Sequence, residues 1–239
     1  MRRDAGFPMR LRFCKRGRVR FISHRDVARA FERAFRIQRL PLVFTEGFSP
    51  RPRVSFGLAL SVGHESDAEY LDVELAEPVD LVTLTAPLSA ALPDGIDVTG
   101  SVRLTMRAAA LQESVTSVAY RIEIDGDGAS REPVDLTAAI DQAMSAPTVL
   151  AVRRRKGVEV TDDVRPAIRH LEPINSSALE LEVATQPHGV RPESVVAALP
   201  GDWSTRSVLR THQWIERDGA RREPLDADAR PHVPEARAS

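Results

Sequence analysis

The sequence predicts an α+β fold made of two ferredoxin-like (βαββαβ) units with antiparallel sheets. Strand-type and helix-type patterns alternate along the 239 residues, which are enough for a buried core. The order of elements in the first half recurs in the second. The four expected helices centre near residues 31, 86, 140 and 195, so the halves match at a spacing of about 109 residues.

The first half begins with alternating residues around Leu11 and Phe13, which predict a strand. Ser23, followed three residues later by Asp26, predicts a helix start, and Pro41 ends that helix. The expected elements are a strand over 9–15 extended by 19–22, a helix from 24 to about 39, strands over 42–45, 54–62 and 70–75, a helix over 80–92 and a strand over 96–108.

The second half follows the same order. Its expected elements are a strand over 118–124, a helix over 135–145, a hairpin over 148–154 and 158–160, strands over 164–171 and 179–184, a helix over 192–199 and a strand over 203–215. Residues 218–239 are rich in Ala, Arg and Pro and predict a disordered tail. The predicted domains are therefore 1–110 and 111–217, followed by this tail.

Composition excludes several classes of protein. No apolar run approaches the roughly 18 residues of a membrane helix, and the basic N-terminus lacks an apolar signal core. We therefore expect a cytoplasmic protein without a membrane partner. Cys14 is the only cysteine, which excludes an internal disulfide and a cluster held by several cysteines of this chain. No metal spacing or cofactor motif is recognised, so neither is expected.

The net charge of -1 hides an asymmetry along the chain. Residues 1–60 hold 15 Lys or Arg and 4 Asp or Glu, a balance of +11. The remainder holds 18 against 30, a balance of -12. A basic first quarter predicts binding of a polyanion or an acidic partner. The alternative is that the basic and acidic segments neutralise each other inside the fold.

The first expected helix carries an arginine stripe. At 100° per residue, Arg36, Arg29 and Arg33 fall at about 20°, 40° and 80° from Arg25. The apolar side chains between about 180° and 280° predict the buried face, and they are Val27, Phe31, Ala34 and Phe35. Like charges four residues apart repel, which favours an anion on this stripe. The alternatives are a solvated face or pairing with acidic residues elsewhere.

His24 lies at the first turn of the same helix, where the helix dipole disfavours a protonated ring. One interpretation makes it a general base or a hydrogen-bond donor to a ligand. The other, which is more common for lone histidines, makes it a structural residue packed against Phe31.

The loop over 46–53 combines conformational freedom at Gly47 with two prolines that stiffen it. Arg51 and Arg53 project from this frame beside Phe48, an arrangement that suits phosphate and base recognition. The alternative is a rigid crossover whose Phe48 fills the core.

Two charged turns are less specific. The acids at 65, 67 and 69 could hold a metal or a cation, but acids on a turn are more often solvated. The basic run 153–156 is either a solvated turn or an extension of a binding surface.

Residues 10–75 resemble the radical SAM-associated (radical-SAM-linked) family, a bacterial domain of unknown function. The runs that carry the resemblance are Arg20 to Asp26, Leu40-Pro41-Leu42, Gly47 to Phe56, Gly63, Glu65 and Glu69 to Asp72. The family usually has an apolar residue at position 25 and a histidine at position 51. The resemblance implies a radical SAM protein as partner. Such an enzyme needs three closely spaced cysteines, so this chain is at most its accessory.

We therefore expect a non-catalytic, RNA-binding accessory protein that contacts structured RNA through the stripe and the loop. Two alternatives stay open. One is a metal-independent endoribonuclease with His24 as acid and base. The other is a domain that docks a radical SAM enzyme through the stripe.

Overall fold

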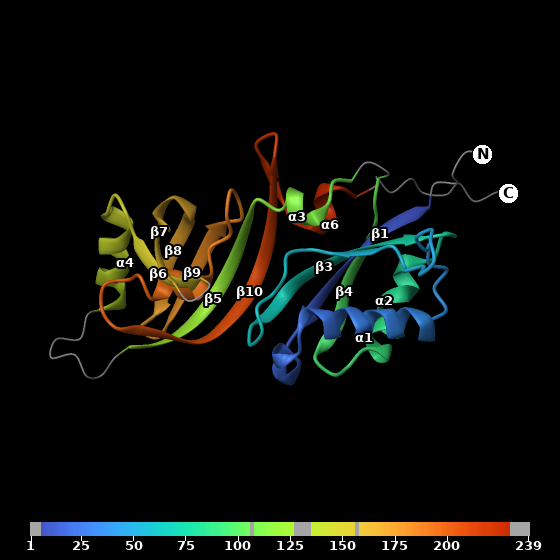
Figure 1. Ribbon diagram of the computed structural model, residues 1–239, viewed down its shortest axis with the longest axis horizontal. Coiled ribbons are helices and arrows are strands. Elements are labelled where there is room, and N and C mark those ends of the chain that lie inside the picture. Colours follow the sequence, from blue (N-terminus) through green and yellow to red (C-terminus); the bar gives the residue numbers. More distant parts are fainter. Residues whose placement is uncertain (1–5, 106–107, 127–134, 156–157, 230–239) are drawn as a thin grey trace.

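The computed structural model describes residues 6–105, 108–126, 135–155 and 158–229. One sheet runs through an elongated molecule, with helices packed against it in both halves (Figure 1). The first half contains β1 (Phe7–Lys15), the 3₁₀ helix η1 (Gly17–Phe21), α1 (His24–Ile37), β2 (Val54–Phe56), β3 (Glu65–Leu75), α2 (Leu81–Ala91), β4 (Ile96–Arg103) and α3 (Leu111–Ser114).

The second half repeats the alternation and adds a hairpin that forms its own two-stranded sheet. Its elements are β5 (Ser117–Gly126), α4 (Leu136–Ser145), β6 (Leu150–Arg155), β7 (Val158–Asp163), η2 (Arg165–Ala167), β8 (Ile168–Asn175), β9 (Ala178–Ala184), α5 (Pro192–Val196), β10 (Trp203–Arg217), β11 (Ala220–Arg222) and α6 (Pro224–Ala227). No helix among the described residues is both long and apolar enough to cross a membrane.

Strand order confirms the α+β class with a mostly antiparallel sheet. The first half runs β4-β1-β3-β2 and the second runs β10-β5-β9-β8, with antiparallel neighbours throughout. The expectation of separate sheets is wrong. β10 pairs with β3 in parallel, through Leu209 opposite Glu65 and Arg210 opposite Ser66, so the two halves share one nine-stranded sheet.

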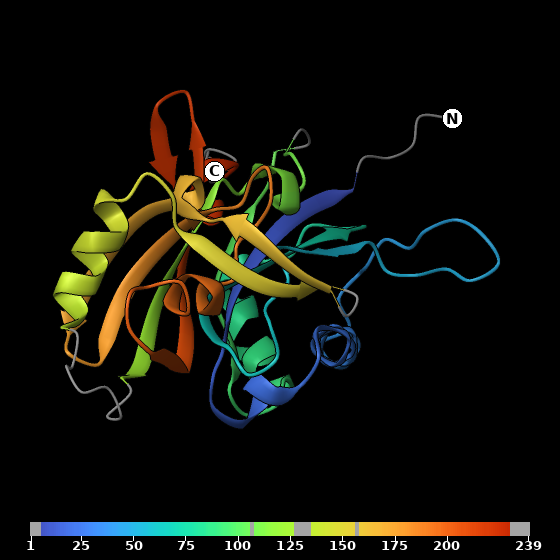
Figure 2. The same cartoon turned by 60° about the vertical axis from the view of Figure 1, so that its left-hand side comes forward.

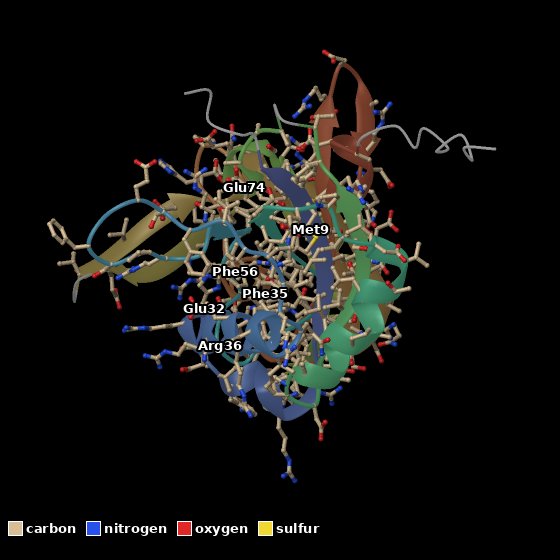
Figure 3. The ribbon with its side chains drawn as sticks, turned by 90° about the vertical axis from the view of Figure 1, so that its right-hand side faces the viewer. Met9, Glu32, Phe35, Arg36, Phe56 and Glu74 are labelled. Atoms are coloured by element: carbon tan, nitrogen blue, oxygen red, sulfur yellow. The ribbon has the colours of Figure 1, made fainter. Side chains whose placement is uncertain are left out.

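Helix α1 forms as its sequence predicts. Ser23 caps it, since the Ser23 hydroxyl accepts a hydrogen bond from the Asp26 amide. The predicted buried face is confirmed, because Val27, Phe31, Ala34 and Phe35 pack into the core of the first half. Figure 3 shows Glu32 and Arg36 on a different side of the helix from Phe35.

Several expected strands differ from the structure. The strand expected over 70–75 already begins at 65, so the acids at 65, 67 and 69 lie on β3 and not on a turn, the one over 96–108 ends at 103, and the one over 164–171 begins at 168, after η2. Residues 17–21 form η1 instead of extending the first strand, because Gly17 takes a positive φ of 68°. The strand expected over 54–62 ends at Phe56. The carbonyls of Leu58 and Ala59, which follow it, accept hydrogen bonds from the Arg210 side chain instead of from a neighbouring strand. Residues 42–45 make only isolated bridges, in a hairpin that extends away from the sheet.

A buried ion pair fixes the junction between the halves. Arg210 on β10 is 4% exposed and donates to Glu69 on β3 at 2.8 Å. The same guanidinium donates to the carbonyls of Leu58 and Ala59 at 3.1 Å and lies over the Tyr120 ring. Burial acts to lower the pKa of Arg210, but Glu69 and Tyr120 together outweigh it and raise that pKa. Arg210 therefore stays charged and binds both halves.

The C-terminal segment corrects another expectation. Part of the predicted disordered tail is ordered, as β11 and α6, while residues 230–239 lie outside the described residues. Its anchor is polar: the fully buried Arg10 donates to the Pro224 carbonyl at 2.9 Å and to Asp228 at 3.4 Å. Arg10 also makes two hydrogen bonds to Asp72. The tail supplies partners to a buried charge, which its composition does not indicate.

Replacing Arg210 by Met should lower the free energy of unfolding by about 3–5 kcal/mol, because Glu69 would keep a buried charge without a partner. Urea unfolding at neutral pH measures this. Arg206→Met is the matched control on the same strand, since its exposed pair with Glu123 contributes about 1 kcal/mol or less. Equal losses in the two variants would show that Arg210 does not fix the junction.

Candidate functional site

The arginine stripe lies on the exposed side of α1. Arg25, Arg29, Arg33 and Arg36 are all exposed. Arg29 lies 3.4 Å from Asp26, three residues earlier. A hydrogen bond from Ser23 holds the pKa of Asp26 below its ordinary value, so this partner is ionised at neutral pH. The other three arginines of the stripe make no ion pair within the described part of the chain.

Glu32 does not neutralise the stripe. It stands four residues before Arg36, a spacing that favours an ion pair on a helix. Both side chains point outward in Figure 3, yet the described residues include no ion pair between them. The stripe therefore presents net positive charge to the outside.

Elsewhere, neighbouring acids neutralise much of the basic first quarter. Arg16 binds Asp67 at 2.7 and 2.5 Å, and Arg20 lies 3.7 Å from Glu65. The acids at 65, 67 and 69 thus pair with arginines, the last of them with Arg210. Among the described residues no cluster has the composition of a metal site. The mutual neutralisation that the sequence left open therefore applies to the arginines of β1 and to Arg20 of η1, whereas on the α1 stripe it reaches only Arg29.

The loop over 46–53 belongs to a protruding hairpin, residues 43–53, which we call the arm. Figure 2 shows it extending away from the sheet beyond α1, which is seen end-on. Backbone hydrogen bonds from Thr45 to Arg51 and from Arg53 to Val43 hold the arm together. A further bond from Val43 to the Glu74 carbonyl attaches it to the end of β3.

The arm separates its three predicted binding residues. Phe48 is completely exposed, so the alternative in which it fills the core is wrong. Arg51 is exposed, and its guanidinium has no partner among the described residues. Arg53 binds Glu74 at 2.9 Å, and this bond raises the pKa of the guanidinium. Phe48 and Arg51 are therefore available to a ligand, whereas Arg53 supports the arm.

His24 lies at the rim of a small cavity under the first turn of α1. Its ring meets Phe56 edge to face at 5.1 Å between centroids, so the predicted packing partner, Phe31, is replaced by Phe56. The cavity measures about 10 Å³, which is room for one water molecule. Lys15 and Glu69 also line it.

Lys15 is a residue that sequence reasoning missed. It is 3% exposed, and its ammonium donates to the carbonyls of Arg20 and Ile22, each at 3.2 Å. Burial lowers the pKa of Lys15, and the nearby Glu69 carboxylate acts in the opposite direction. One sequence signal was available, since Lys15 is one of only two lysines among 33 basic residues. Lys15, Glu69 and Arg210 thus form a buried cluster of charged side chains, which connects the N-terminus of α1 to the junction between the two halves.

A second contact across the halves also went unpredicted. His64, which is buried, is hydrogen-bonded to Glu193 on α5. Burial acts to raise the pKa of Glu193, but the bond to His64, a backbone hydrogen bond and the nearby Arg191 together outweigh it and hold that pKa below its ordinary value. The basic run 153–156 lies on the β6–β7 hairpin, and its side chains are outside the described residues.

The lowered pKa of Lys15 predicts a specific pH dependence. The folded protein binds this proton more weakly than the unfolded chain does, so stability rises as pH rises toward the ordinary lysine pKa of about 10.4. Lys15→Met removes the titrating group. Urea unfolding between pH 7 and 10.5 should therefore show wild type gaining stability relative to the variant. If the free energy of unfolding changed with pH in the same way in wild type and in Lys15→Met, the pKa of Lys15 would not be lowered in the folded protein.

Comparisons with known proteins identify a family and show a distant likeness to solved structures. Residues 9–192 match the family described as "Uncharacterized protein conserved in bacteria (DUF2344)". No curated protein matches the chain. A chain in the "Crystal Structure of a Cbf5-Nop10-Gar1 Complex" is 13% identical with a TM-score of 0.45, over 88% of this chain and 54% of that one. This chain thus spans about half of that structure's length. The family match covers most of the 239 residues, and the chain belongs to this uncharacterized bacterial family.

Proposed function

We propose that this protein is a non-catalytic accessory module that binds structured RNA through the α1 stripe and the arm. One observation carries the proposal: Arg25, Arg33 and Arg36 stand together on one helix face and make no ion pair with any carboxylate of the described residues. Acids do pair with the arginines of β1, with Arg20 of η1 and with Arg53. Single arginines elsewhere, Arg18, Arg39 and Arg51, also make no ion pair within the described ranges, but α1 is where three of them share one face.

The physical argument concerns repulsion. Arginines three and four residues apart on a helix repel each other, by a few tenths of a kcal/mol per like pair. An RNA strand relieves this repulsion, because its phosphates accept guanidinium hydrogen bonds and release counterions on binding. Arg51 on the arm adds a guanidinium beyond the helix, on a backbone held by its own hydrogen bonds. The two features offer an extended site that suits a chain of phosphates.

The duplicated ferredoxin-like architecture is part of the same proposal. The matching strand orders β4-β1-β3-β2 and β10-β5-β9-β8 support two copies of one βαββαβ unit, with β6–β7 inserted in the second. A radical SAM enzyme as partner rests on the resemblance of residues 10–75. With Cys14 as its single cysteine, this chain would deliver or position RNA while the partner provides the cluster.

Replacing Arg25, Arg33 and Arg36 together by Gln should weaken RNA binding and reduce its salt dependence. Each lost phosphate contact removes about 0.7 from the slope of log affinity against log salt for single-stranded RNA, so three contacts remove about 2. Fluorescence anisotropy with a labelled stem-loop RNA, between 50 and 300 mM KCl, measures both quantities.

The matched control replaces Arg121, Arg191 and Arg222, three exposed arginines outside the stripe and arm, by Gln. It removes the same charge and should leave the slope nearly unchanged. An equal slope for both triple variants would reassign the stripe to a protein partner or to solvent. Incubating the RNA with wild type and His24→Ala in EDTA tests the nuclease alternative. Cleavage by wild type alone would replace the accessory role by catalysis.

A further inference from the structure

The tip of the arm exposes an aromatic ring that does nothing for the fold. Phe48 has a relative exposure of 111%, more than any other large apolar side chain in the described residues. It takes no part in the ring contacts that join Phe13, Phe31 and Phe56. Burying a phenylalanine side chain stabilises a folded protein by about 1.5–3 kcal/mol, and the free protein receives none of this stabilisation from Phe48.

The arm holds this ring in a prepared position. Thr45 and Arg51 exchange two hydrogen bonds, one between backbones at 2.8 Å and one from the Arg51 amide to the Thr45 hydroxyl at 3.0 Å. Only residues 46–50 lie beyond these bonds. Gly47 turns the chain with a φ of 126°, and Pro50 stiffens the return. A ligand therefore meets a ring whose backbone needs little further ordering.

The surroundings of Phe48 favour a nucleic-acid ligand over an apolar pocket or a lipid. Next to the tip, the Arg51 guanidinium has no partner in the described part of the chain. Figure 3 places Arg36 of the stripe on the side of α1 toward which the arm extends. Phe44 is the other large apolar residue exposed on the arm, at 52%. Two separate rings among cations are too little for a membrane anchor and match an interface of phosphates and bases.

We infer that Phe48 stacks on an unpaired base of the RNA whose phosphates lie on the stripe, so that the ligand is a single strand or a loop and not an uninterrupted duplex. Bases inside a duplex already stack on each other and offer no free face to a side chain. An unpaired base offers such a face, whatever its identity. This inference rests on the proposed function and specifies which class of RNA the site takes.

The test compares two RNAs of equal length, a stem-loop with 2-aminopurine in its loop and a blunt duplex with the same modified base. Wild type should bind the stem-loop more tightly and change the 2-aminopurine fluorescence there alone. Phe48→Ala should weaken stem-loop binding by about 5- to 150-fold, the range for one stacked base, and abolish the fluorescence change. Its affinity for the duplex should stay the same.

Phe44→Ala is the control, because it removes a ring from the same arm and should leave the preference for the stem-loop intact. Phe48 makes no core contact, so Phe48→Ala should also unfold at the same urea concentration as wild type. Unchanged stem-loop affinity in Phe48→Ala, or equal losses on both RNAs, would overturn the stacking role. So would Phe48-dependent binding to anionic vesicles in place of RNA. Failure of wild type to bind either RNA would instead refute the proposed function itself.

Discussion

The buried contact between Arg210 and Glu69 is the constraint on which the arrangement of this molecule depends. β10 is the last long strand, yet it lies between β3 and β5 and completes the sheet of both halves. Only two residue pairs form the parallel ladder between β10 and β3. The guanidinium adds bonds to two carbonyls of the 57–60 segment, which crosses beside α1. The position of the α1 N-terminus is therefore tied to a residue near the end of the chain.

This arrangement also distributes charge. β3 brings a series of acids next to β1 and η1, so that Arg10, Arg16 and Arg20 find carboxylates within the fold. α1 faces the other way, with its apolar side on β1 and its arginines outward. The sequence asymmetry of +11 against -12 is thus only partly cancelled in space, and three of the arginines without an ion pair in the described residues share one face of α1. A localised excess is what distinguishes a binding surface from an ordinary charged exterior.

Local signals allowed much of the first half to be predicted. The Ser23 cap and the buried face of α1 depend on residues a few positions apart, and the structure confirms both. Contacts between distant residues could not be predicted in this way. Glu69 and Arg210 are 141 positions apart, and no pattern around either one indicates the pairing. The prediction of a disordered tail was wrong for the same reason, because the tail is held by a contact between Arg10 and Asp228, which are 218 positions apart.

Ultraviolet crosslinking of the purified protein to RNA, followed by mass spectrometry of the attached peptides, tests the central claim most directly. The protein should be studied before any nuclease treatment, so that RNA carried from the cell is retained. The account predicts nucleotide adducts on peptides that cover α1 and the arm, with Phe48 among the modified residues. Adducts confined to the second half, or none at all on α1 and the arm, would contradict it.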